Sequence, residues 1–128
     1  KVAEWLEADP RIEHVYWAGL PNHPHHDRAR KYLPAGAGSV FSFVVKGGRA
    51  VGQKLIESVN LASHLANIGD AKTLVIHPAS TTHAQLTEQQ LLDAGVLPGV
   101  VRISVGIEDA DDIIYDLDQA LTEAVKEA

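Results

Sequence analysis

The sequence predicts an α/β domain, a two-layer α+β sandwich in which one sheet of about four strands is covered on one face by helices. Two observations support this fold class. Short apolar stretches with strand composition alternate with stretches of helical periodicity along the whole chain. The chain has 128 residues, of which 45% are hydrophobic and 22% charged, so it can bury one core and needs no internal domain boundary.

Four stretches are predicted to be β-strands. The clearest runs from Ser39 to Lys46, because Phe41, Phe43 and Val45 alternate with the residues of the opposite face. The other three are short and rich in apolar or β-prone side chains, and we place them at residues 12–17, 74–76 and 100–105.

Stretches of helical periodicity separate these strands. Thr87 is a natural N-cap and Gly95 a natural stop, which predicts a helix between them. Helices are expected up to residue 7 and at residues 27–31, 49–59, 88–94 and 113–125. Acidic side chains crowd the start of the last helix, where the helix dipole favours negative charge: Glu108, Asp109, Asp111 and Asp112. We expect them to stabilise the helix rather than to take part in catalysis.

The composition excludes several classes of function. Lys and Arg total 11 against 17 Asp and Glu, a formal net charge of −6, so no nucleic-acid partner is expected. The absence of Cys excludes disulfides, thiolate metal sites and cysteine nucleophiles. No apolar run approaches the roughly 20 residues of a membrane helix, so no membrane partner is expected. The chain lacks Met and opens on Lys1 in helical periodicity, and we therefore expect a piece of a longer protein.

Two clusters of chemically reactive side chains favour structural roles. The tract His23-Pro24-His25-His26 has the composition of a metal site, but only Asp27 offers a nearby carboxylate, so a loop leading into a helix is favoured. In Ser80-Thr81-Thr82-His83 no glycine elbow presents a hydroxyl, and a hydrolytic triad is not expected. Glycine-rich nucleotide-binding motifs are also absent. We therefore assign no catalytic residue and no metal ligand.

Arg102 is unusual because it lies in the middle of a short apolar strand, between Val101 and Ile103. A charged side chain in that position needs a partner or a wet cleft. One interpretation is an edge strand whose arginine lies in solvent or pairs with a carboxylate of a helix. The other is a rigid fork that binds a substrate carboxylate through two hydrogen bonds. Asn67 could add an amide donor, although its place beside Gly69 favours an ordinary turn residue.

Residues 101–109, Val-Arg-Ile-Ser-Val-Gly-Ile-Glu-Asp, resemble part of the C-terminal signature of the pyridoxal-phosphate-dependent Cys/Met metabolism family. This family includes cystathionine synthases and lyases, methionine γ-lyase and O-acetylhomoserine sulfhydrylase. The signature continues through residues 112–114 and 116–121. Further stretches fit the family in the same order, so that the resemblance covers nearly the whole chain. They are residues 15–16, 19–21, 23–26, 41–43, 46–48 and 78–83.

The resemblance implies the smaller C-terminal domain of a fold-type-I enzyme, with residues 1–128 forming this single domain around a mostly antiparallel sheet. In the family, the Schiff-base lysine, the aspartate that pairs with the pyridine nitrogen and the phosphate-binding residues lie in a larger upstream domain. Nothing in this sequence matches that domain. We therefore expect pyridoxal 5'-phosphate in the full-length enzyme and none bound to this fragment.

The stretch Asn67-Ile68-Gly69-Asp70 lies where lyases of the family carry Ser-Leu-Gly-Gly. Together with Ser63-His64-Leu65-Ala66 before it, this stretch resembles the O-acetylhomoserine sulfhydrylase branch. An ungapped alignment places Asn67 on the carboxylate-binding serine of the lyases, and Arg102 falls on the carboxylate-binding arginine of the family. The resemblance thus implies that Arg102 and Asn67 bind the carboxylate of an amino-acid substrate.

The implied reaction converts O-acetyl-L-homoserine and sulfide to homocysteine and acetate in methionine biosynthesis. The implied enzyme is cytoplasmic and, when full length, a homo-oligomer, expected to be a homotetramer. The partners of this chain would be the two substrates and the missing N-terminal cofactor domain. Two alternatives remain: a cystathionine γ-synthase or a lyase of the same family, and a free-standing α/β module that regulates by binding an amino acid through Arg102.

Overall fold

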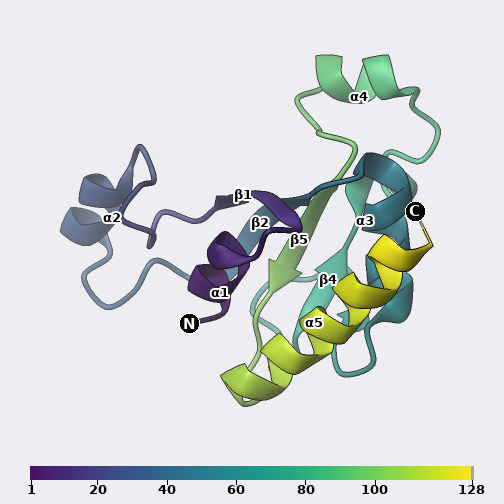
Figure 1. Ribbon diagram of the computed structural model, residues 1–128. Coiled ribbons are helices and arrows are strands. Elements are labelled where there is room, and N and C mark those ends of the chain that lie inside the picture. Colours follow the sequence, from purple (N-terminus) through teal and green to yellow (C-terminus); the bar gives the residue numbers. More distant parts are fainter. Residues whose placement is uncertain (128) are drawn as a thin grey trace.

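The computed structural model describes residues 1–127 and shows one five-stranded sheet with helices packed against it (Figure 1). The strands are β1 (Ile12–Tyr16), β2 (Val40–Val45), β3 (Ser63–His64), β4 (Leu74–Ile76) and β5 (Val100–Ser104). The helices are α1 (Val2–Ala8), α2 (His26–Tyr32), α3 (Gly48–Ser58), α4 (Glu88–Asp93) and α5 (Ala110–Lys126), with a short 3₁₀ turn, η1 (Pro78–Ser80), after β4. No helix in this described part is long and apolar enough to cross a membrane.

The sheet has the strand order β1-β2-β5-β4-β3, so that β5 lies in its middle. β1, β2, β5 and β4 run antiparallel to one another in turn, whereas β3 is parallel to β4. The expected two-layer fold with a mostly antiparallel sheet is therefore confirmed, with β3 as an additional strand. β3 consists of Ser63 and His64 alone, which is too short for an alternating pattern to be visible in the sequence.

The core lies between one face of the sheet and the helices α1, α3 and α5. Figure 1 shows α3 and α5 next to each other on this side of the strands, with α1 beside β1. Phe43, Val101 and Ile103 of the sheet belong to one cluster with Leu55 of α3 and Leu121 of α5, and each is at most 1% exposed. Burial of one such side chain contributes roughly 1.5–3 kcal/mol, so the core fixes which side chains of β5 point the other way.

Arg11 fastens the start of β1 to α5. Its Nε and Nη2 donate to the two carboxylate oxygens of Asp9 at 2.9 and 2.6 Å. Nη2 also donates to Asp118 Oδ1 at 2.5 Å, and Nη1 donates to Thr122 Oγ1 at 3.0 Å. The hydrogen bonds from Arg11 lower the pKa of Asp9, so this carboxylate stays ionised and holds the guanidinium.

The acidic start of α5 differs in one respect from the sequence-based expectation. Asp109 caps the helix, because its Oδ1 accepts a hydrogen bond from Asp111 N at 2.8 Å, and Asp111 and Asp112 lie in the first turn. Glu108, however, lies before the helix and its carboxylate binds Thr73, near the start of β4. The expectation that Glu108 stabilises the helix end was therefore wrong.

Gly52 of α3 gives a first testable prediction. A Cβ at this position would lie 2.5 Å from Nε2 of the buried His77. Replacing glycine by alanine inside a helix normally stabilises a protein by about 0.5–1 kcal/mol. We expect Gly52→Ala to destabilise this chain by about 1–3 kcal/mol instead, because the imidazole has no room to move. Urea unfolding measures the effect, with the exposed neighbour Gln53→Ala as control. A higher urea midpoint for Gly52→Ala would contradict the packing of His77 against α3.

Candidate functional site

Arg102 lies on β5, between β2 and β4, in the interior of the sheet. Its register partners are Ser42 on β2 and Ile76 on β4. Because its neighbours Val101 and Ile103 point into the core, Arg102 points to the opposite face of the sheet. The edge-strand interpretation of this arginine is therefore wrong.

The guanidinium of Arg102 is half-buried, and within residues 1–127 no carboxylate pairs with it and no hydrogen bond satisfies it. Pairing with a helix carboxylate, the other part of the first interpretation, is thus not observed among the described residues. A charged group held on an interior strand without a protein counterion favours binding of an external anion.

A depression of about 310 Å³ lies beside Arg102 on the same sheet face. Register places Tyr16 of β1 next to Ser42 of β2, and Ser42 next to Arg102. The residues that line the depression are Tyr16, Ser42, Gly95, Leu97 and Val100. Arg102 is therefore the register neighbour of Ser42, one of the residues that line this hollow together with the ring of Tyr16.

Ser104 lies two residues beyond Arg102 on the same face and is 3% exposed. Its Oγ has no hydrogen-bond partner among the described residues. Leaving a buried hydroxyl unsatisfied costs about 1–3 kcal/mol. β5 thus carries two polar side chains, Arg102 and Ser104, whose hydrogen-bonding needs the described residues do not meet.

Asn67 lies in the exposed loop between β3 and β4. Its Oδ1 accepts a hydrogen bond from Ile68 N at 2.8 Å, and its Nδ2 makes only a 3.5 Å contact with Asp70 Oδ2. Gly69 adopts a positive φ of 74° beside it, so the local conformation is the turn that the sequence favoured. The loop begins after His64, the last residue of β3, which pairs with Val75 of β4. The next residue of β4, Ile76, is the register partner of Arg102. Among the described residues, the hydrogen bonds of the Asn67 side chain stay within its own loop, and none joins it to Arg102.

Residues 1–122 match the family model described as Cys/Met metabolism PLP-dependent enzyme. The chain belongs to this family. It is 48% identical over 120 residues to O-acetyl-L-homoserine sulfhydrylase 1 of Thermus thermophilus, and 50% identical over 120 residues to the homocysteine synthase of Schizosaccharomyces pombe. Each alignment covers 94% of this chain and 28% of the relative, so the chain spans less than a third of the length of these two family members.

Solved structures of the family agree with the fold. A Campylobacter jejuni protein described as an O-acetylhomoserine (thiol)-lyase superposes with a TM-score of 0.84 at 38% identity, covering 94% of this chain and 29% of that protein. That structure contains a pyridoxyl-lysine monophosphate. Cystathionine gamma synthase from Xanthomonas oryzae, solved in complex with cystathionine, also gives 0.84, at 33% identity over 99% of this chain and 33% of its own length.

The described residues do not fit pyridoxal phosphate itself. A lysine that carries this cofactor must lie in the site with its amine free to react. Here Lys1, Lys54 and Lys126 form ion pairs with carboxylates at the surface, and Lys46 Nζ donates to the carbonyl of Pro10. None of the lysines lines the depression beside Arg102.

His77 is fully buried, and its role was not predicted from the sequence. Its Nδ1 lies 2.8 Å from Ser80 Oγ and its Nε2 lies 2.6 Å from Pro98 O, while Thr81 Oγ1 donates to His77 O at 2.9 Å. Ser80 therefore pairs with His77 rather than with His83. This group ties η1 to the segment that leads into β5. An imidazole directly before a proline at the end of an apolar strand was the one available signal.

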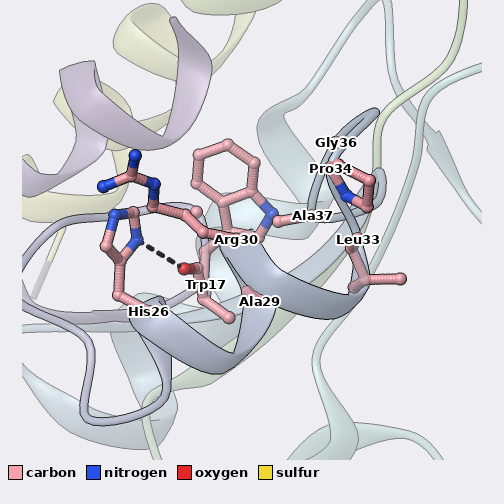
Figure 2. Close-up of a pocket in the computed structure, with 10 residues that line it drawn as sticks. Trp17, His26, Ala29, Arg30, Leu33, Pro34, Gly36 and Ala37 are labelled. Carbon is pink, nitrogen blue, oxygen red and sulfur yellow. Dashed lines mark hydrogen bonds between the residues drawn. The ribbon is translucent and has the colours of Figure 1, made fainter.

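His26 of the histidine tract lines a cavity of about 480 Å³ beside α2, which is shown in Figure 2. His26 Nδ1 lies 2.9 Å from Ala18 O, whereas His23 Nδ1 accepts a hydrogen bond from His25 N at 3.1 Å. Within residues 1–127 no three His, Asp or Glu side chains gather as a metal ion requires. Figure 1 shows α2 beyond the edge strand β1, at the edge of the sheet opposite to β4 and β3. This cavity is therefore separate from Arg102, which lies on the central strand β5.

His77 also predicts a dependence of stability on pH. Burial lowers the pKa of His77 below its ordinary value of 6.5, although the hydrogen bond to Pro98 opposes this shift. The neutral imidazole stabilises the fold fully above pH 6.5, and this contribution declines as the pH falls below 6.5 because the unfolded chain then binds the proton more readily. Urea unfolding between pH 7.5 and pH 5 should show a steeper loss for the wild type than for His77→Gln. The exposed His14→Gln is the control, and equal slopes for His77→Gln and wild type would contradict the prediction.

Proposed function

We propose that residues 1–128 form the C-terminal domain of a longer O-acetylhomoserine sulfhydrylase-like enzyme, and that this domain binds the carboxylate of the amino-acid substrate. The observation that carries the proposal is the uncompensated guanidinium of Arg102 on an interior strand. Membership of the Cys/Met metabolism family supports it, because the resemblance to that family implies that Arg102 is its carboxylate-binding arginine.

The geometry suits a carboxylate. The planar fork of an arginine donates two parallel hydrogen bonds to the two oxygens, and β2 and β4 hold the backbone of Arg102 on both sides. Asn67 is the second contact in this proposal, because its Nδ2 is occupied only by the long contact to Asp70 and is available to donate. Fixing the acid end of the substrate in this way orients its Cα–H bond for reaction, which lowers the entropic part of the barrier.

The full-length enzyme would replace the acetyl group of O-acetyl-L-homoserine by sulfide, giving homocysteine and acetate for methionine synthesis. Pyridoxal phosphate, bound by the upstream domain, would supply the electron-withdrawing chemistry. This chain alone would be inactive, and its partners would be the substrate and that domain. On the basis of the family resemblance, the full-length enzyme would be a homo-oligomer in the cytoplasm.

The sulfhydrylase branch is favoured over the other branches. Among the solved structures, the O-acetylhomoserine (thiol)-lyase is 38% identical and the cystathionine gamma synthase 33%, and the relatives named as a sulfhydrylase and a homocysteine synthase are 48% and 50% identical in sequence. A pseudomonad O-succinylhomoserine sulfhydrylase is also 44% identical over 120 residues, covering 94% of this chain and 30% of its own length, so the acyl group of the substrate is a choice between acetyl and succinyl. Assay of the full-length enzyme with both esters, and with sulfide and cysteine as sulfur donors, separates these branches.

Arg102→Ala in the full-length enzyme tests the proposal. Loss of a buried charge-assisted fork typically costs on the order of 2–4 kcal/mol, so the KM for O-acetyl-L-homoserine should rise at least tenfold while the KM for sulfide changes little. Arg28→Ala, in α2, removes an exposed guanidinium and is the matched control. An unchanged KM for the amino acid in Arg102→Ala would refute the assigned role.

The cofactor assignment has its own test. When the purified 128-residue chain is mixed with pyridoxal phosphate and desalted, we expect no visible absorbance to remain with the protein, since its lysines are surface groups. The full-length enzyme, treated in the same way, is the positive control. Retention of one equivalent of cofactor by the isolated chain would contradict the expectation.

A further inference from the structure

The loop of residues 65–72, which carries Asn67, has little packing of its own. Leu65 and Ile68, its large apolar residues, are 54% and 69% exposed. Its side chains bond mainly to near neighbours in sequence, as in the hydrogen bond from Lys72 N to Asp70 Oδ1 at 2.9 Å. A loop without buried side chains takes its position from the elements at its two ends.

The first end of this region is held by Asp116, a residue of α5 that is 4% exposed. Asp116 Oδ1 accepts a hydrogen bond from Asn60 N at 2.6 Å. Its Oδ2 accepts from Leu61 N at 3.0 Å and from Ala62 N at 2.9 Å, and Gln119 Nε2 donates to Oδ1 at 3.2 Å. No cationic side chain among residues 1–127 pairs with this buried charge, so these donors alone compensate it. The segment that leads into β3 is therefore fixed to α5 through this carboxylate.

The second end is held by Glu108, directly before α5. Glu108 Oε1 accepts a hydrogen bond from Thr73 N at 2.8 Å, and Oε2 accepts from Thr73 Oγ1 at 2.7 Å. The same hydroxyl accepts from Gly106 N at 2.9 Å, and Ile107 N donates to Ala71 O at 2.9 Å. A Cβ on Gly106 would lie 2.3 Å from Ala71 O, so the two segments approach more closely than any side chain at position 106 would allow.

The ionisation of Glu108 is consistent with this arrangement. Partial burial acts to raise its pKa, but the hydrogen bonds from Thr73 outweigh that effect and leave the pKa below its ordinary value. Near neutral pH the group is therefore a carboxylate with two acceptor oxygens, as both donors of Thr73 require.

We infer that Glu108 and Asp116 are positioning residues, which fix the two ends of the Asn67 loop to the segment that carries Arg102. Both carboxylates follow Arg102 in one continuous stretch, through β5 into α5. Removal of either one leaves Arg102 in its strand but releases one end of the loop. The inference rests on the proposed function, because it assumes that Asn67 and Arg102 bind the same substrate carboxylate.

Kinetics of the full-length enzyme test the inference. Glu108→Gln, Asp116→Asn and Thr73→Val should each raise the KM for O-acetyl-L-homoserine by about tenfold, with a smaller effect on kcat, because substrate positioning is lost while the chemical groups remain. Thr73→Ser keeps the hydroxyl and should stay within about twofold of wild type. Glu13→Gln and Asp112→Asn make the same chemical changes at exposed carboxylates that accept no hydrogen bond within residues 1–127, and should leave the KM unchanged.

Hydrogen exchange of the same variants gives a readout that does not depend on activity. Amides of residues 60–73 should exchange faster in Glu108→Gln and Asp116→Asn, whereas those of β2 and β5 should keep their protection. Faster exchange throughout the chain with an unchanged KM would indicate a general loss of stability and overturn the inference.

The kinetic outcomes also separate the inference from the proposed function. If Arg102→Ala raises the KM but Glu108→Gln, Asp116→Asn and Thr73→Val do not, the positioning role is wrong and the proposed function stands. If Arg102→Ala leaves the KM unchanged as well, the proposed function itself fails.

Discussion

The alternation of side chains along β5 is the constraint on which the site depends. Val101 and Ile103 are completely buried against the helices, so a shift of the strand by one residue would carry the guanidinium of Arg102 into the core. Burying an unpaired charge costs several kcal/mol, which opposes any such slip. The apolar residues of the strand therefore determine where its charged residue points, and the ladders to β2 and β4 hold its backbone on both sides.

Two carboxylates in this molecule, the buried Asp116 and the partly buried Glu108, hold neighbouring segments through hydrogen-bond donors instead of cations. Asp116 gathers three consecutive backbone N–H groups, and Glu108 takes both donors of Thr73. These hydrogen bonds are directional and therefore fix the position of the backbone. Exposed ion pairs such as that of Lys1 with Asp111 contribute only about 0–1 kcal/mol to the stability of the fold. Part of the surplus of acidic residues in the composition is therefore used to place backbone segments.

The sequence predicted the main elements because their periodicities are strong. The alternation of Phe41, Phe43 and Val45 and the cap at Thr87 are local signals, and both have local counterparts in the structure. The roles of Glu108 and His77 could not be predicted in the same way, since their partners lie 35 and 21 residues away in the chain. Periodicity identifies a strand but not its position in a sheet, which is why Arg102 could be suspected from the sequence while its interior location and lack of a counterion could not.

The distribution of unsatisfied groups separates a domain of a larger enzyme from a free-standing module. A module that senses an amino acid on its own encloses most of its ligand, as small-molecule pockets do. Here the fork of Arg102 lies on the same sheet face as a hollow of about 310 Å³, whose lining residues bring no carboxylate to meet an ammonium group. The guanidinium suits the acid end of an amino acid, whereas the lining residues of the hollow offer no charged group to its ammonium end. This asymmetry supports the proposal that the face of Arg102 is one wall of a site shared between domains rather than a complete binding pocket.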